Sequence, residues 1–246
     1  MRTRLMLVGA AAIIVVVLIG LSVADGLLVD LFWFTSLGFR AVFTITLLAQ
    51  IVIFLCVWLI TFAAIAVSGL IAVRVSHERD RLRVVRRSDQ VTEVNLPELI
   101  RSLGDRVPWR LIVVGVAAVL AVFVAQGEAG NWDVYLKAFN GVPFGVTEPA
   151  FGRDVGFFVF QLPLWQELRD LFLMILVLTA VVSGAIYWAR GEIDFRESPP
   201  HISGACAAHG SILLGVLFLQ RAMNYWLGRF ELTLHSNDVV FGLRYV

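Results

Sequence analysis

Three residues of this chain carry side chains that bind metals and stand close together in the sequence: His201, Cys206 and His209. His209 lies inside a long apolar stretch, and Cys206 stands three residues earlier, on the same face of a helix. Imidazole and thiolate groups are ligands of soft metals, so a metal or redox pair is one interpretation. We favour the other, a histidine hydrogen-bonded to a neighbouring helix, because His201 stands outside the apolar stretch and completes only a poor site.

Gln50 is a second polar side chain inside an apolar stretch. It either lines a polar path through the membrane or joins two helices by a hydrogen bond, and the second arrangement is the commoner one. The sequence contains no GxSxG, HExxH or P-loop motif. We therefore expect no catalytic residue, metal or cofactor, and no enzymatic activity.

The composition indicates a membrane protein. Of the 246 residues, 59% are hydrophobic and 16% are charged, and the net charge is +1. Soluble domains have roughly 45–50% apolar and about 25% charged residues. The expected partner is therefore the lipid bilayer and not a nucleic acid.

A helix needs about 20 apolar residues to cross a bilayer, and the apolar runs of this chain predict an all-α integral membrane domain over residues 1–230. We expect five spans, at residues 5–24, 41–73, 109–125, 171–188 and 202–219. Gly204 and Ala208 form a small-xxx-small pattern, which predicts that the last span is the most tightly packed.

Arginine sets the predicted orientation. Nine of the nineteen arginines lie between residues 74 and 110, and basic loops beside membrane spans stay in the cytoplasm. The loop 74–108 is therefore expected inside, together with the N-terminus, and the C-terminus outside. The topology-setting residues are Arg74, Arg79, Arg81, Arg83, Arg86 and Arg87.

The segment 126–170 carries three basic and six acidic residues, so it is expected outside. Asn131 is placed to cap a short interfacial helix with an aromatic face, after which prolines and glycines interrupt helical structure. The tail 231–246 starts an external region and has the alternation of a strand.

Part of this external segment resembles a known family. Residues 143–163 read PFGVTEPAFGRDVGFFVFQLP, which is similar to the DPxFGxDxxFYxFxLP-like segment of uncharacterised protein family 0182, large multi-pass bacterial membrane proteins. The chain departs from that pattern at Glu148, where aspartate is usual, and at Phe158, where tyrosine is usual. The matching positions are Glu148, Pro149, Phe151, Gly152, Asp154, Phe158, Phe160 and Pro163.

The resemblance implies that relatives run several hundred residues further, with about seven spans and a large external portion, so this chain resembles an N-terminal part. It implies no activity. The residues of the motif suit a structural cap, in which phenylalanines seat the loop on the ends of the spans. Asp154 and Arg153 either satisfy backbone groups of the loop or pair with each other.

Three functions remain open at this point. The favoured one is a plasma-membrane domain that anchors a larger external region, with the protein's own C-terminal region or envelope proteins as partners. The alternatives are a transporter or channel subunit, with Gln50 and His209 facing a shared interior, and a membrane enzyme acting on lipid or envelope precursors.

Overall fold

The structure, a computed structural model, describes residues 25–80, 108–194, 201–232, 236–237 and 240–241. The chain divides into two units, residues 1–52 and residues 53–246. The long helix α2 (Arg40–Asp80) crosses the boundary between them. The predicted first span, at residues 5–24, lies outside the described residues.

The first unit contains a helical stretch over residues 25–36 and the beginning of α2. Gly38 adopts a φ of +77°, a value that suits glycine, and so allows the chain to reverse between the two helices. The turn is closed by the Phe39 amide, which donates to the Phe34 carbonyl at 2.8 Å. At 41 residues, α2 has a length of about 60 Å, and the prediction of one uninterrupted helix is confirmed.

The second unit contains the remaining helices and two very short strand pairs. The helices are α4 (Trp109–Ala129), α5 (Trp132–Phe139), the π-helical turn η1 (Phe157–Gln161), α6 (Leu162–Ala189) and α7 (Gly204–Glu231). The antiparallel strand pairs are β1 (Ile193–Asp194) with β2 (His201–Ile202), and β3 (Ser236–Asn237) with β4 (Val240–Phe241).

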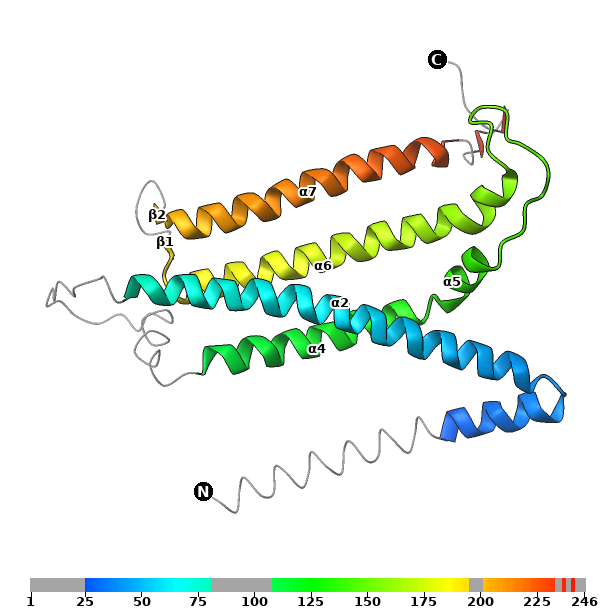
Figure 1. Ribbon diagram of the computed structural model, residues 1–246, viewed down its shortest axis with the longest axis horizontal. Coiled ribbons are helices and arrows are strands. Elements are labelled where there is room, and N and C mark those ends of the chain that lie inside the picture. Colours follow the sequence, from blue (N-terminus) through cyan, green and yellow to red (C-terminus); the bar gives the residue numbers. More distant parts are fainter. Residues whose placement is uncertain (1–24, 81–107, 195–200, 233–235, 238–239, 242–246) are drawn as a thin grey trace, which may run out of the picture. The chain divides into compact units, whose positions relative to one another are not determined.

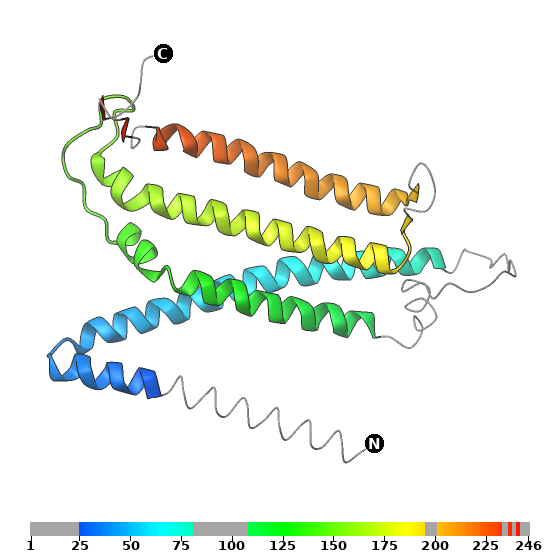
Figure 2. The same cartoon turned by 180° about the vertical axis from the view of Figure 1, so that it is seen from behind.

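Within the second unit the long helices alternate in direction (Figures 1 and 2). The end at which α2 and α6 finish and α4 and α7 begin is called the Arg190 end. There the Arg190 guanidinium donates to the Val73 carbonyl of α2 and lies over the Trp109 ring of α4. The opposite end, called the Phe230 end, holds the last turn of α7, the start of α6, and α5.

Four helical segments in the described part of the chain are long and apolar enough to cross a membrane: Arg40–Ser76, Trp109–Ala129, Phe157–Ala189 and Gly204–Glu231. They coincide with the last four predicted spans, but the predicted boundaries were too narrow. Residues 157–170, which were expected in an external loop, are helical, as are residues 220–231 and the start of the arginine-rich segment.

The helix α6 starts at Leu162, earlier than predicted, and contains Pro163. Proline has no amide hydrogen, and its ring crowds the carbonyl four residues before it, so it disfavours a continuous α-helix. In the structure Pro163 lies in the first turn of α6, where no amide is needed, and the preceding turn widens into η1. The Leu162 amide donates to the Phe157 carbonyl, five residues back, and so joins η1 to α6.

Small residues let the helices of the second unit approach each other. Ala117, Ala121 and Ala125 follow one another at one-turn intervals on α4 and are fully buried. Their stripe packs on α2 and α6. By contrast, α7 is the least buried of the four long helices, and Gly204 and Ala208 are exposed. Gly204 and Ala208 therefore do not form the predicted close helix contact, although α7 lies against α6.

Candidate functional site

Four polar side chains from three helices form one hydrogen-bonded chain near the Arg190 end. Ser68 of α2 contacts Ser183 of α6 at 2.7 Å between the hydroxyl oxygens. The same Ser68 oxygen lies 3.1 Å from Nε2 of His209, and Nδ1 of that imidazole lies 3.0 Å from the Tyr187 hydroxyl. We call these four residues the polar chain. It joins α7 to α2 and α6 through groups that would otherwise be unsatisfied in an apolar setting.

A cavity of about 270 Å³ lies between α6 and α7 beside the polar chain. Ser183, Tyr187, Cys206 and His209 line one end of it. The rest of the wall is apolar and extends toward the middle of both helices; it consists of Leu176, Val177, Ala180, Gly184, Gly210, Leu213, Leu214 and Leu217.

The metal-binding candidates do not come together as a set of three. Cys206 and His209 share the cavity wall, while His201 belongs to strand β2 before α7 begins. Among the residues that the structure describes, no group of three or more His, Cys, Asp or Glu side chains is placed to hold a metal ion.

A second polar arrangement organises the loop of the family-like motif at the Phe230 end. The Asp154 carboxylate accepts hydrogen bonds from the backbone amides of Phe144, Gly145 and Gly156, at 3.0, 2.9 and 2.6 Å. These bonds favour the charged form and hold the pKa of Asp154 below its usual value. Asp154 therefore satisfies backbone groups of the loop, one of the two roles considered for it.

Glu148 closes the neighbouring turn in a similar way. Its two carboxylate oxygens accept from the amides of Ala150 and Phe151, at 2.9 and 2.7 Å. Gly152, with a φ of +63°, donates its amide to the Glu148 carbonyl and so lets the chain reverse. The exposed Pro149 lies inside this turn.

Replacing Asp154 with Asn is expected to release this loop. An amide oxygen is a weaker acceptor than a carboxylate, so hydrogen-exchange protection across residues 142–156 should fall several-fold at pH 7. In the natural chain, protection should be complete above about pH 4, the unfolded pKa, and decline as the pH falls through the lower folded pKa. Asp133→Asn, which removes the Lys137 ion pair on α5 and lies outside this loop, is the control. Unchanged protection in Asp154→Asn would contradict this role.

Aromatic side chains join the loop to the last turn of α7. Phe230 is fully buried, and its ring centroid lies 4.9 Å from that of Phe151 and 5.3 Å from that of Phe157. Phe158 and the buried Leu162 and Leu227 complete this cluster, which we call the Phe230 cluster. The Arg153 guanidinium lies over the Phe157 ring at 4.6 Å, a cation–π contact.

Phe160, another residue of the motif, lies apart from the Phe230 cluster. Its ring stacks on Phe144 within the loop, with centroids 5.8 Å apart. Phe160 therefore holds the loop to η1, whereas the cluster holds it to α7.

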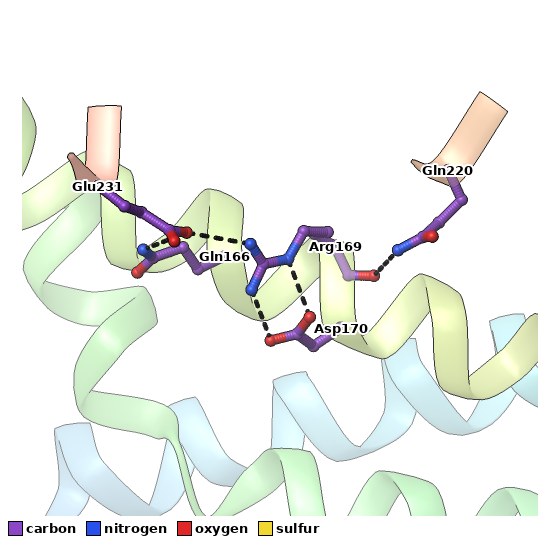
Figure 3. A network of polar contacts seen from close by, with 5 residues as sticks. All are labelled: Gln166, Arg169, Asp170, Gln220 and Glu231. Atoms are coloured by element: carbon purple, nitrogen blue, oxygen red, sulfur yellow. Dashed lines mark hydrogen bonds and ion pairs between the residues drawn. The ribbon is translucent and has the colours of Figure 1, made fainter. Parts of the chain in front are cut away.

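Ion pairs also fix the end of α7 (Figure 3). The Arg169 guanidinium of α6 donates to both carboxylate oxygens of Asp170 and, at 3.1 Å, to Oε1 of Glu231 on α7. Gln166 donates to the same Glu231 oxygen at 2.9 Å. The Gln220 amide points from α7 toward the Arg169 carbonyl.

Another pair of side-chain hydrogen bonds ties α5 to α4 and α6. Tyr135 of α5 donates to the buried Glu128 of α4, and Asn131 donates to Glu167 of α6. Burial, reinforced by the Glu128 carboxylate, raises the pKa of Tyr135. Asn131 precedes α5 as predicted, but its side chain makes no capping bond and reaches Glu167 instead.

The remaining candidates lie elsewhere. Gln50 is half-buried in the first unit, so the idea that it shares an interior with His209 stays a prediction. Arg74 is exposed on α2, and Arg79 belongs to the same helix. Arg81, Arg83, Arg86 and Arg87 lie outside the described residues.

Sequence reasoning missed Ser68, Ser183 and Tyr187 as partners of His209. Ser183 and Tyr187 are spaced i, i+4, and this spacing was the available signal for a polar face on α6. Ser68 is 141 residues from His209, and no local pattern connects them.

Comparison with known proteins agrees with the resemblance in the loop. The model of the uncharacterised protein family UPF0182 matches residues 7–246. UPF0182 proteins of Cupriavidus necator, Bradyrhizobium diazoefficiens and Nocardioides sp. are 39%, 35% and 30% identical over 94%, 97% and 99% of this chain.

The same alignments cover only 24%, 26% and 23% of those relatives, so the chain spans about a quarter of their length. No solved structure matches the chain. With a family model matched over nearly all its residues, and with the loop motif at the Phe230 end, the chain belongs to the uncharacterised protein family UPF0182.

Proposed function

We propose that this chain is a multi-pass plasma-membrane anchor that holds the segment after α7 in a fixed position outside the cell. The observation that carries the proposal is the convergence of contacts on the last turn of α7. Most of α7 is exposed, yet Leu227 and Phe230 are fully buried and Glu231 is paired with Arg169. Such local bracing is expected where a helix positions the next part of the chain.

The last turn of α7 is contacted by a loop, by η1 and by α6. The loop contributes Phe151, η1 contributes Phe157 and Phe158, and α6 contributes Arg169. Asp154 and Glu148 in turn hold the loop through five backbone amides. The end of α7 is thereby attached to a preorganised support, which favours an anchor over a flexible tether.

Spin labels on Val181 of α6 and on Leu232 at the end of α7 test the bracing, since both positions are exposed. In the full-length protein in lipid nanodiscs we expect a narrow distance distribution. Arg169→Gln should broaden it, because Glu231 loses this ion pair. Arg221→Gln removes an exposed charge from α7 and serves as the matched control. A distribution that Arg169→Gln leaves as narrow as the control would refute the bracing.

Sidedness is tested by reporter fusions in the same protein. Fusions after Asn140 and Val246 should report the outer side, and one after Ser88 the inner side, because the arginine-rich segment favours the cytoplasm. An inner signal at Asn140 would overturn the anchor in this orientation.

A transporter or channel subunit is the second candidate, and the polar chain favours it. Hydrogen-bonded side chains that link three helices inside their apolar segments are a feature of substrate and proton paths. Modification of Cys206 by a membrane-impermeant thiol reagent applied to the outside of intact cells would show a water-filled path beside His209 and favour this candidate over the anchor.

A further inference from the structure

We propose that the cavity between α6 and α7 is a binding site for a neutral, lipid-soluble molecule whose polar end carries a carbonyl oxygen. The inference is independent of the anchoring function. It rests on the number of hydrogens in the polar chain, on the absence of charge from the cavity wall, and on the direction in which the wall changes from polar to apolar.

The polar chain contains four polar hydrogens, and its three hydrogen bonds use only three of them. Ser68, Ser183, Tyr187 and a neutral His209 carry one polar hydrogen each, and three hydrogen bonds connect them. If Tyr187 donates to the imidazole, the hydroxyl hydrogen of Ser183 is left over. If the chain runs the other way, the hydrogen of Tyr187 is left over.

Both residues that can hold this spare hydrogen, Ser183 and Tyr187, line the cavity. Neither hydroxyl has a second hydrogen-bond partner among the residues that the structure describes. An unsatisfied donor in apolar surroundings is costly, so the site favours a ligand that brings an acceptor oxygen.

The charge of the ligand follows from the lining. None of the cavity residues is Asp, Glu, Lys or Arg, so a charged group would be desolvated there without a partner. The occupant is therefore a neutral molecule with an acceptor, such as a quinone or an acyl ester.

The orientation of the ligand follows from the helices. The polar residues lie close to the Arg190 end, within two turns of the end of α6 and the start of α7. From Tyr187 back to Leu176, and from Cys206 on to Leu217, the wall extends by about 16 Å toward the middle of the span. A polar head near the membrane surface with an apolar tail toward the midplane matches this gradient. The volume is close to the lower end of the ~300–1,000 Å³ range of ligand pockets.

Photoactivatable probes that differ only at the head test the site. A fully substituted benzoquinone, a fatty acid methyl ester and an alkane, each with a diazirine in an equal tail, are added to the full-length protein in nanodiscs of ether lipids, which lack carbonyls. Labelled peptides of α6 and α7 are quantified by mass spectrometry. We expect at least one carbonyl probe to label residues 213–217 about ten times more than the alkane, equivalent to one strong hydrogen bond.

Two variants separate the head from the tail. The triple variant Ser183→Ala, Tyr187→Phe and His209→Ala removes the hydroxyl and imidazole hydrogens from the cavity lining, so it should reduce carbonyl labelling to the level of the alkane without changing labelling by the alkane. Gly184→Leu should abolish labelling by filling the apolar part, since a side chain at Gly184 meets nothing within 4 Å. Gly215→Leu is the matched control, because Gly215 is equally open and does not line the cavity.

Each outcome decides the question. Preferential labelling by the quinone or by the ester identifies which carbonyl compound the site takes. Equal labelling by the alkane would mean an ordinary lipid-filled groove and would overturn the proposal. An absence of labelling by all three probes would mean that another part of the full-length protein covers the cavity, and would overturn it as well.

Discussion

Phe230→Ala should destabilise the folded protein by about 3–5 kcal/mol, the usual cost of removing a fully buried phenylalanine from a packed core. Phe230 has no exposed surface and is the centre of the Phe230 cluster, so its loss leaves Phe151, Phe157 and Phe158 around a void. The free energy of unfolding in mixed detergent micelles measures the effect.

Phe218→Ala is the matched control for this prediction. Phe218 belongs to the same helix but is 67% exposed, so lipid or detergent fills the space that the truncation leaves. We expect a loss below about 1 kcal/mol, typical of surface substitutions. Similar losses at residues 218 and 230 would show that the Phe230 cluster does not stabilise the end of α7.

Gly69→Leu should destabilise the protein by about 1–3 kcal/mol through overpacking. A Cβ atom on Gly69 would lie 2.6 Å from Cγ1 of Val113, and Val113 is itself buried between α2, α4 and α6. Because valine is restricted at χ1, it cannot rotate away cheaply, and α2 must move from α4. Ser68 would move with it and lengthen its contact with His209.

The control and the rescue use the same measurement of unfolding free energy. Gly115→Leu introduces the same side chain on α4, where nothing lies within 4 Å, and should cost little. Val113→Ala should partly restore Gly69→Leu, so that the two changes are non-additive. Equal destabilisation by Gly69→Leu and Gly115→Leu, or strict additivity with Val113→Ala, would rule out this close approach.

The sequence predicted which segments form long apolar helices because hydrophobicity is a local property. It misplaced their ends, because helices continue beyond the apolar run when polar residues find partners. Arg169 and Glu231 illustrate this: each looks like a loop residue alone, and together they pair across α6 and α7. The start of α6 was placed at residue 171, where the apolar run begins, whereas the helix starts at Leu162 and holds Pro163 in its first turn.

The candidate site could be predicted only in part. His209 was identified because a titratable side chain in an apolar run is conspicuous. Its partners were not, because the hydroxyls of Ser68 and Ser183 are common in such helices and meet only through tertiary packing. Asp154 was identified through the loop motif, while its three amide donors depend on the folded turn.

The modest hydropathy of α7 has a consequence for biogenesis. Its best window has a mean hydropathy of 1.3, against 2.2 to 2.7 for the other three long helices. Such a segment by itself moves from the translocon into the lipid bilayer with little gain in free energy. Charged side chains such as those of Arg169 and Glu231 make this transfer still less favourable. In a membrane, the ion pair between them would lower this cost and would favour the entry of α6 and α7 together as a helical hairpin. Membrane insertion of α7 would then depend on α6 having been synthesised first.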